Sequence, residues 1–124
     1  PATILKLADI DVPEKYQGRS LLPLLRGSTP ADWRSNFFTE FNSSNKKLPD
    51  WRGVHGKRYT YANYYGQKPA VETLYDLEED PDQMNNLASD PGHTKILNRM
   101  RSRTERYLKE YRRPEIMKLK VAPK

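Results

Sequence analysis

The sequence predicts an α+β fold, in which a four-stranded antiparallel sheet is packed by a long C-terminal helix and preceded by short N-terminal helices. Two patterns support this prediction. Four short segments rich in aromatic and β-branched residues are separated by turn-forming residues, which is typical of strands. After them, apolar residues recur every three, four and seven positions between about residues 91 and 112, which is typical of one amphipathic helix. Together the patterns predict a sheet with one face covered by a helix.

Two short helices are expected before the sheet. The buried face of the first is marked by Ile4, Leu5 and Ala8, and this helix should end near residues 8 and 9. Ser20 is a suitable cap for the second helix, and Gly27 is placed to close it in a left-handed conformation. The apolar side of the second helix consists of Leu21, Leu22 and Leu25.

The first strand is predicted at Ser35 to Phe41, where side chains alternate between two faces. One face would hold Phe37, Thr39 and Phe41. The next two strands are predicted at Trp51 to His55 and at Arg58 to Tyr64. Gly56 lies between them and could supply the positive φ of a tight hairpin. We therefore expect these two strands to pair in antiparallel fashion.

The fourth strand is predicted at Leu74 to Leu77 and is stopped by an acidic turn. Asp80 could cap a short helical segment that begins at Pro81, and the pair Asp90-Pro91 repeats this arrangement. The long helix then runs from Pro91 or Gly92 to about Arg112. Its apolar stripe consists of Ile96, Leu97, Met100, Tyr107, Leu108 and Tyr111.

The net charge of +6 is unevenly placed, because cations crowd this last helix. Eight cations lie there, beside only two carboxylates: Lys95, Arg99, Arg101, Arg103, Arg106, Lys109, Arg112 and Arg113, with Glu105 and Glu110. They can be the solvated face of an amphipathic helix, partners for carboxylates of another domain, or a polyanion-binding module. The sequence has no nucleic-acid recognition motif, so we predict no nucleic-acid partner.

Several classes of site and protein are excluded by composition. The chain has no cysteine, so it forms no disulfide and no thiolate metal site. No apolar run approaches the roughly 20 residues of a membrane span. The acidic turn from Glu78 to Asp82 lacks the spacing of a calcium loop, so we predict no metal in this chain. The two imidazoles are His55 and His93, and we expect His93 to be a surface residue.

Three segments resemble the C-terminal subdomain of sulfatases, the arylsulfatase-like hydrolases of the alkaline phosphatase superfamily. They are TLYDLEEDPDQMNNLASDP at Thr73 to Pro91, PATILKLADIDVPEKYQGRSLLPLLRG at Pro1 to Gly27, and WRGVHGKRYTYA at Trp51 to Ala62. They follow the order of the family. The resemblance implies residues 1–33 as the connection from a catalytic domain, 34–113 as the subdomain and 114–124 as a basic tail. It further implies a C-terminal fragment of a bacterial enzyme that hydrolyses sulfate esters on carbohydrates, in a periplasmic or secreted setting.

The resemblance also implies what this chain lacks. Sulfatases use formylglycine, made from Cys or Ser in a Cys/Ser-x-Pro-x-Arg motif, beside a calcium ion. Neither Ser20 nor Ser28 stands in such a motif. We therefore predict no catalytic residue here and an inactive chain. Calcium and formylglycine are expected in a missing N-terminal catalytic domain of the same polypeptide. Removing that domain would expose apolar area around Ile4, Leu5, Leu22 and Leu25 and could cause self-association.

Three residues are candidates for contact with the sulfated carbohydrate, because the family's subdomain leans over the rim of the active-site cleft. His55 could touch the sugar or aryl part of the substrate, Arg52 could pair with a second sulfate or a carboxylate, and Trp51 could stack on a sugar ring. Each also has a structural interpretation: an ordinary turn residue for His55, a tie to Asp50 or Glu40 for Arg52, and a cover for the sheet edge for Trp51.

Overall fold

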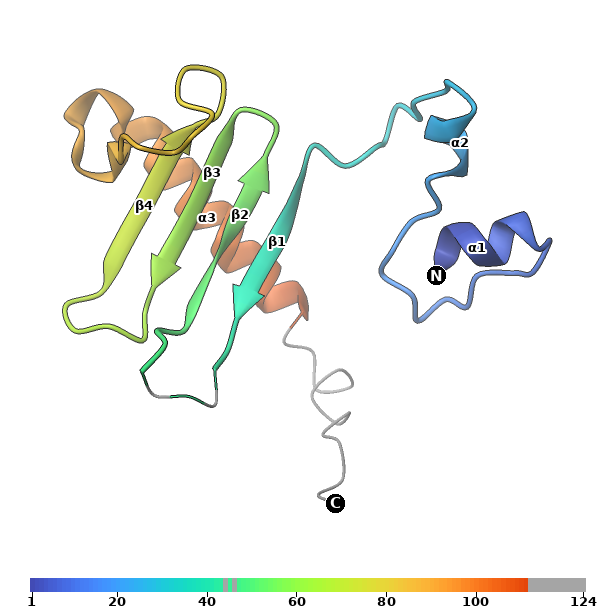
Figure 1. The fold of residues 1–124 in the computed structure, drawn as a ribbon, viewed down its shortest axis with the longest axis horizontal. Coiled ribbons are helices and arrows are strands. Elements are labelled where there is room, and N and C mark those ends of the chain that lie inside the picture. Colours follow the sequence, from blue (N-terminus) through green and yellow to red (C-terminus); the bar gives the residue numbers. More distant parts are fainter. Residues whose placement is uncertain (44, 46, 112–124) are drawn as a thin grey trace. The chain divides into compact units, whose positions relative to one another are not determined.

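The computed structural model describes residues 1–43, 45 and 47–111 and confirms the predicted α+β fold (Figure 1). The chain divides into two compact units, Pro1–Arg34 and the residues from Ser35 onward. The predicted tail, residues 114–124, and the predicted helix end at Arg112 lie outside the described residues. Among the described helices, none combines the length and apolarity that crossing a bilayer requires.

The first unit contains α1 (Ala2–Leu7) and α2 (Leu22–Leu25), joined by a hydrogen bond from the Leu21 N–H to Thr3 Oγ1 at 2.9 Å. Gly27 has φ of 76°, as expected of the glycine that closes α2. The expected apolar faces are largely exposed, however: Ile4 and Leu25 each keep 70% of their surface accessible. Two helices of six and four residues are too short to cover each other's side chains.

The second unit is built on four antiparallel strands in the order β1-β2-β3-β4. They are β1 (Asn36–Phe41), β2 (Trp51–Gly56), β3 (Tyr59–Tyr64) and β4 (Val71–Asp76). β4 begins three residues before the predicted start, because Val71, Glu72 and Thr73 continue the pairing with β3. The predicted positive φ at Gly56 is wrong. Gly56 ends β2 opposite Asn36, and the chain turns at residues 57 and 58.

The predicted short helix at Pro81 is also wrong, because the chain forms a turn there. Gln83 has φ of 56°, which ends any helical path. Asp80 instead accepts hydrogen bonds from the backbone N–H groups of Met84 at 3.0 Å and Asn85 at 2.8 Å. Two 3-10 turns follow, η1 (Leu87–Ser89) and η2 (Pro91–His93). Asp90 caps η2 as predicted, accepting from the Gly92 N–H at 2.9 Å.

The long helix α3 (Thr94–Tyr111) lies along one face of the sheet (Figure 1). It begins after η2, two or three residues later than the predicted start at Pro91 or Gly92. Its buried side packs on the middle strands and forms one core, made of Val54, Tyr61, Leu74, Leu97 and Met100. Val54 and Leu74 are fully buried. The sheet therefore has one face sealed by α3.

Candidate functional site

Successive side chains of β2 point to opposite faces of the sheet, and the three candidate residues are therefore divided between the two faces. Val54 points into the core beneath α3, so Arg52, two positions away, lies on this covered face. Trp51 and His55 lie on the opposite face, which we call the open face. The predicted site is therefore not a single cluster.

The open face is arranged in three rows that run across the strands. The middle row is small: Thr39, Gly53, Ala62 and Thr73. One flanking row contains Phe37, His55, Thr60 and Tyr75, and the other contains Phe41, Trp51, Tyr64 and Val71. Because large side chains flank small ones, the face is hollowed, with a cavity of about 250 Å³ that His55 and Trp51 both line.

Gly53 lies in the small middle row of the open face, and no larger residue fits there. A Cβ at this position would lie 1.8 Å from the Tyr61 carbonyl oxygen and 2.9 Å from Ala62 Cα. Strands β2 and β3 thus approach each other closely at this point, which is a recognised use of glycine inside a strand. Sequence reasoning missed Gly53, although a glycine in the middle of a strand is a signal of such a close approach.

His55 lies at one end of the hollow with its ring held in place. Its Nδ1 is 3.2 Å from Thr60 Oγ1, and its ring centroid is 5.2 Å from that of Phe37. Within the described residues, no hydrogen bond involves its Nε2. The imidazole can therefore offer Nε2 to a ligand while Thr60 and Phe37 fix its orientation.

Trp51 belongs to an aromatic wall at the other side of the hollow. Its ring centroid lies 6.5 Å from that of Phe41, in a stacked arrangement, and 6.2 Å from that of Tyr64. The interpretation of Trp51 as the cover of a sheet edge is wrong, because β2 is an inner strand. An aromatic plane beside a hollow is a surface on which the apolar face of a ring can pack.

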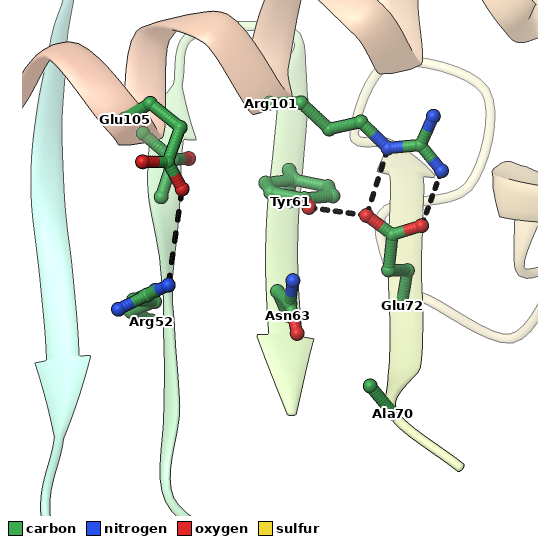
Figure 2. Close-up of a pocket in the computed structure, with 8 residues that line it drawn as sticks. Arg52, Tyr61, Asn63, Ala70, Glu72, Arg101 and Glu105 are labelled. Carbon is green, nitrogen blue, oxygen red and sulfur yellow. Dashed lines mark hydrogen bonds and ion pairs between the residues drawn. The ribbon is translucent and has the colours of Figure 1, made fainter. Parts of the chain in front are cut away.

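Arg52 contacts neither Asp50 nor Glu40 through an ion pair, so the structural interpretation given for it is wrong. Its Nη2 lies 3.8 Å from Glu105 Oε1, and its guanidinium carbon lies 4.7 Å from the centre of the Tyr65 ring. Figure 2 shows Arg52 in a second pocket, of about 380 Å³, between α3 and the sheet.

Three further side chains in this second pocket form a closed hydrogen-bond network (Figure 2). Glu72 accepts from Arg101 Nε at 2.9 Å and from the Tyr61 hydroxyl at 2.5 Å, and Arg101 Nη2 donates to its other oxygen. Hydrogen bonding by Arg101 holds the pKa of Glu72 below its usual value. Burial raises the pKa of Tyr61, so its hydroxyl stays protonated. Each guanidinium here faces a carboxylate, which suits a stabilising role.

The remaining titratable candidates form structural contacts. Asp76 is buried, with 4% of its surface accessible, and receives three hydrogen bonds from Arg58 at 2.8 to 3.0 Å. These hydrogen bonds hold the pKa of Asp76 below its usual range. His93 is only partly exposed and lies 2.7 Å from Asp90. The described part of the chain contains no group of three His, Asp or Glu side chains that could hold a metal ion.

Comparison with known proteins places these features in one family. Residues 1–110 match the family model described as "N-sulphoglucosamine sulphohydrolase, C-terminal". The chain is 36% identical, over 86% of its length, to a Δ4,5-hexuronate-2-O-sulfatase of Bacteroides thetaiotaomicron, and 28% identical, over 89%, to an N-acetylglucosamine-6-O-sulfatase of the same organism. A solved structure of a 2-O GAG sulfatase superposes on 98% of the chain with a TM-score of 0.79 and 33% identity.

The matches cover only a small part of each relative. The chain spans 22% and 20% of the lengths of the two bacterial sulfatases and 26% of the solved chain. The four-stranded sheet and its helix therefore correspond to the C-terminal part of much longer proteins.

Proposed function

Because the chain belongs to the sulfatase family of the alkaline phosphatase superfamily, matching its C-terminal model over residues 1–110, we propose that it is the C-terminal fragment of an enzyme that hydrolyses sulfate esters of carbohydrates. The observation that supports this most strongly is the match to carbohydrate sulfatases over nearly the whole chain, within only about a fifth of their length. The fragment completes the fold of the enzyme and shapes its substrate cleft. By itself it is inactive.

The chemistry that the family requires does not fit the residues of this chain. Formylglycine is made from Cys or Ser in a Cys/Ser-x-Pro-x-Arg motif. The sequence has no Cys, and Ser28-Thr29-Pro30 is followed by Ala31 and Asp32, so the required arginine is missing. We assign formylglycine and calcium to a catalytic domain that precedes these residues in the same polypeptide.

The open face supplies the proposed substrate contacts. His55 presents Nε2 at one end of the hollow, and Trp51 offers an aromatic plane on the other side, so the two can contact one sugar residue at different edges. This pairing of a hydrogen-bonding group with an apolar plane suits a carbohydrate ring. Arg52 faces the other side of the sheet and is already near Glu105, and its contact with a second sulfate stays a separate prediction.

Two further proposals follow, one on the location of the parent enzyme and one on the behaviour of the chain alone. The relatives are bacterial sulfatases, and we propose a periplasmic or secreted location for this one too. We also propose that the chain alone self-associates through the exposed apolar residues of α1 and α2, among them Ile4 and Leu25. Light scattering that shows only monomer at hundreds of micromolar would contradict this.

The test uses the full-length enzyme, assayed with a sulfated oligosaccharide and with a small aryl sulfate. His55→Ala and Trp51→Ala should each lower kcat/KM for the oligosaccharide about tenfold, mainly through KM, and leave the aryl sulfate nearly unaffected, because only the larger substrate reaches both side chains. Arg52→Ala tests its separate prediction in the same assay. Lys57→Ala, at the exposed hairpin turn, is the control.

Two outcomes would contradict parts of the proposal. If the full-length protein hydrolyses phosphate esters but no sulfate ester, the assigned reaction is wrong. If it hydrolyses sulfate esters but the His55 and Trp51 variants behave like Lys57→Ala, the substrate contacts are wrong while the reaction stands.

A further inference from the structure

The side of α3 that points away from the sheet has an unusual arrangement of charge. The buried side of the helix is defined by Leu97, Met100, Thr104 and Leu108. Four other residues, at spacings of three and four, share the outer face: Arg99, Ser102, Arg103 and Arg106. They line a shallow hollow of about 440 Å³. Lys95 and Lys109 extend the same face toward the two ends of the helix.

Three other arginines of the second unit lie near carboxylates, whereas the arginines of this outer face do not. Arg101 pairs with Glu72, Arg58 with Asp76, and Arg52 lies near Glu105. In the described residues, no ion pair with a carboxylate involves Arg99, Arg103 or Arg106. Arg106 contacts only the Tyr107 ring, at 5.7 Å.

This arrangement weakens the helix rather than supporting it. Like charges four residues apart, as at Arg99 and Arg103, destabilise a helix by about 0.2–0.5 kcal/mol per pair. The first turn of α3 contains no acidic residue, and Lys95 places a cation at the end where the helix dipole is positive. Helix stability therefore does not explain the positions of Lys95, Arg99 and Arg103.

The outer face of α3 and the open face of the sheet lie on opposite sides of the second unit. Figure 1 shows the sheet with α3 on one side only. The apolar open face, with Phe37 46% exposed, is the side suited to a neighbouring domain and its cleft. A domain seated there would leave the outer face of α3 exposed.

We propose that Arg99, Arg103 and Arg106, together with Ser102, bind a sulfated polysaccharide along the outer face of α3. The inference rests on the proposed function, because a sulfatase that acts on carbohydrates meets polymers with repeated sulfate groups. From Arg99 to Arg106 the helix rises by about 10 Å, at about 1.5 Å per residue, so the guanidinium groups can contact successive anions of an extended chain. Each guanidinium can donate two parallel hydrogen bonds to one sulfate, and the Ser102 hydroxyl can donate a further one.

Nucleic acid is the competing polyanion. Proteins that bind single strands place aromatic side chains beside the basic groups so that bases can stack on them. None of the four residues that line this hollow is aromatic. The ring of Tyr107 packs against Phe38 and Tyr111, and its hydroxyl donates to Asn36. The surface therefore suits a ligand recognised through its sulfate groups alone.

The experiment measures binding of the full chain to a size-defined heparin fragment, to the same fragment after desulfation, and to a DNA strand of similar charge, over a salt series. The triple variant Arg99→Gln, Arg103→Gln, Arg106→Gln should bind sulfated heparin at least about tenfold more weakly. Its plot of log K against log salt should be shallower by about two to three units, because fewer counterions are released. Glutamine retains helix propensity, so folding should persist.

The matched control carries the same loss of three charges at exposed positions elsewhere: Lys15→Gln, Arg26→Gln and Lys68→Gln. It should change heparin affinity by less than about twofold at moderate salt. A second variant, with lysine at the three arginine positions, keeps the charge but loses the planar guanidinium that donates two parallel hydrogen bonds. It should bind sulfated heparin with intermediate affinity. Circular dichroism of each variant checks that α3 is intact.

Several outcomes would overturn the inference: equal losses in the helix variant and the control, no heparin binding by the unmodified chain, or DNA binding as tight as that of sulfated heparin. These are distinguishable from failure of the proposed function. Hydrolysis of a sulfated monosaccharide by the full-length enzyme does not require the arginines on the outer face of α3, so that activity can survive when polysaccharide binding fails. If the full-length enzyme does not hydrolyse the sulfated monosaccharide, the proposed function is wrong, whether or not the chain binds heparin.

Discussion

The two faces of the sheet use the same strands for different purposes. On the covered face, apolar side chains meet α3, and carboxylates such as Glu72 and Asp76 are each paired with an arginine. On the open face, rows of large side chains border a hollow, with the imidazole of His55 at its end. Strand alternation thereby separates the residues of the folding core from those of the proposed substrate contacts. The consequence of a substitution should depend first on which face the residue occupies.

The largest expected difference is between Leu74→Ala and Phe37→Ala. Leu74 has no accessible surface, so its truncation leaves a cavity under α3 and should lower the free energy of unfolding by about 3–4 kcal/mol. Phe37 is 46% exposed on the open face, so its truncation should cost less than about 1 kcal/mol. Urea unfolding of the chain, followed by circular dichroism, measures both. Equal losses would show that the open face also contributes to the folding core.

Gly53→Ala should be an exception to this contrast between the two faces. Gly53 lies in a row of the open face, yet its substitution should lower the free energy of unfolding substantially. The added Cβ would meet the backbone of β3, at 1.8 Å from the Tyr61 oxygen, and relieving that overlap requires the two strands to move apart. We expect the free energy of unfolding to fall by about 2 kcal/mol. Gly18→Ala is the matched control, because a Cβ there has no neighbour within 4 Å and should leave the unfolding free energy nearly unchanged. Identical behaviour of the two variants would contradict the close approach.

Sequence patterns predicted most of this fold, because the elements that depend on repeated local signals formed as expected. The alternation in β1 and the three-and-four spacing of α3 each specify a face over many residues, so one misplaced residue changes little. The cap at Asp90 was predictable for a related reason, since its side chain bonds a backbone N–H only two residues away.

The features that were missed depend on contacts between residues distant in sequence. Tyr61, Glu72 and Arg101 form one network across 40 positions, from 61 to 101, and no local pattern links them. The structural interpretation of Arg52 paired it with Asp50 or Glu40, whereas its ion pair is with Glu105, which α3 brings to the covered face. The positive φ assigned to Gly56 assumed a turn one residue too early. Strand register and tertiary packing determined these three features, and short stretches of sequence specify both only weakly.

The smallest expected effect concerns Glu72 on the covered face. Its pKa is lowered in the folded state, chiefly by hydrogen bonds from Arg101, so its contribution to stability is present above the pKa of the unfolded chain and is lost as the pH falls below it. Because Arg101 is 44% exposed, solvent screens the pair, and Glu72→Gln should cost only about 1 kcal/mol at pH 7. The difference from the unmodified chain should shrink as the pH is lowered from 7 toward 3, because the unfolded chain binds the proton at a higher pH than the folded chain does.

Glu79→Gln is the control for that titration, because Glu79 is exposed in the acidic turn and forms no ion pair with any described residue. This variant should match the unmodified chain at both pH values. A Glu72→Gln difference that stays constant between pH 7 and pH 3 would mean that the side-chain amide loses shape or hydrogen bonding to Tyr61 rather than charge. The charge of the Glu72–Arg101 pair would then not contribute to the contrast between the covered face and the open face.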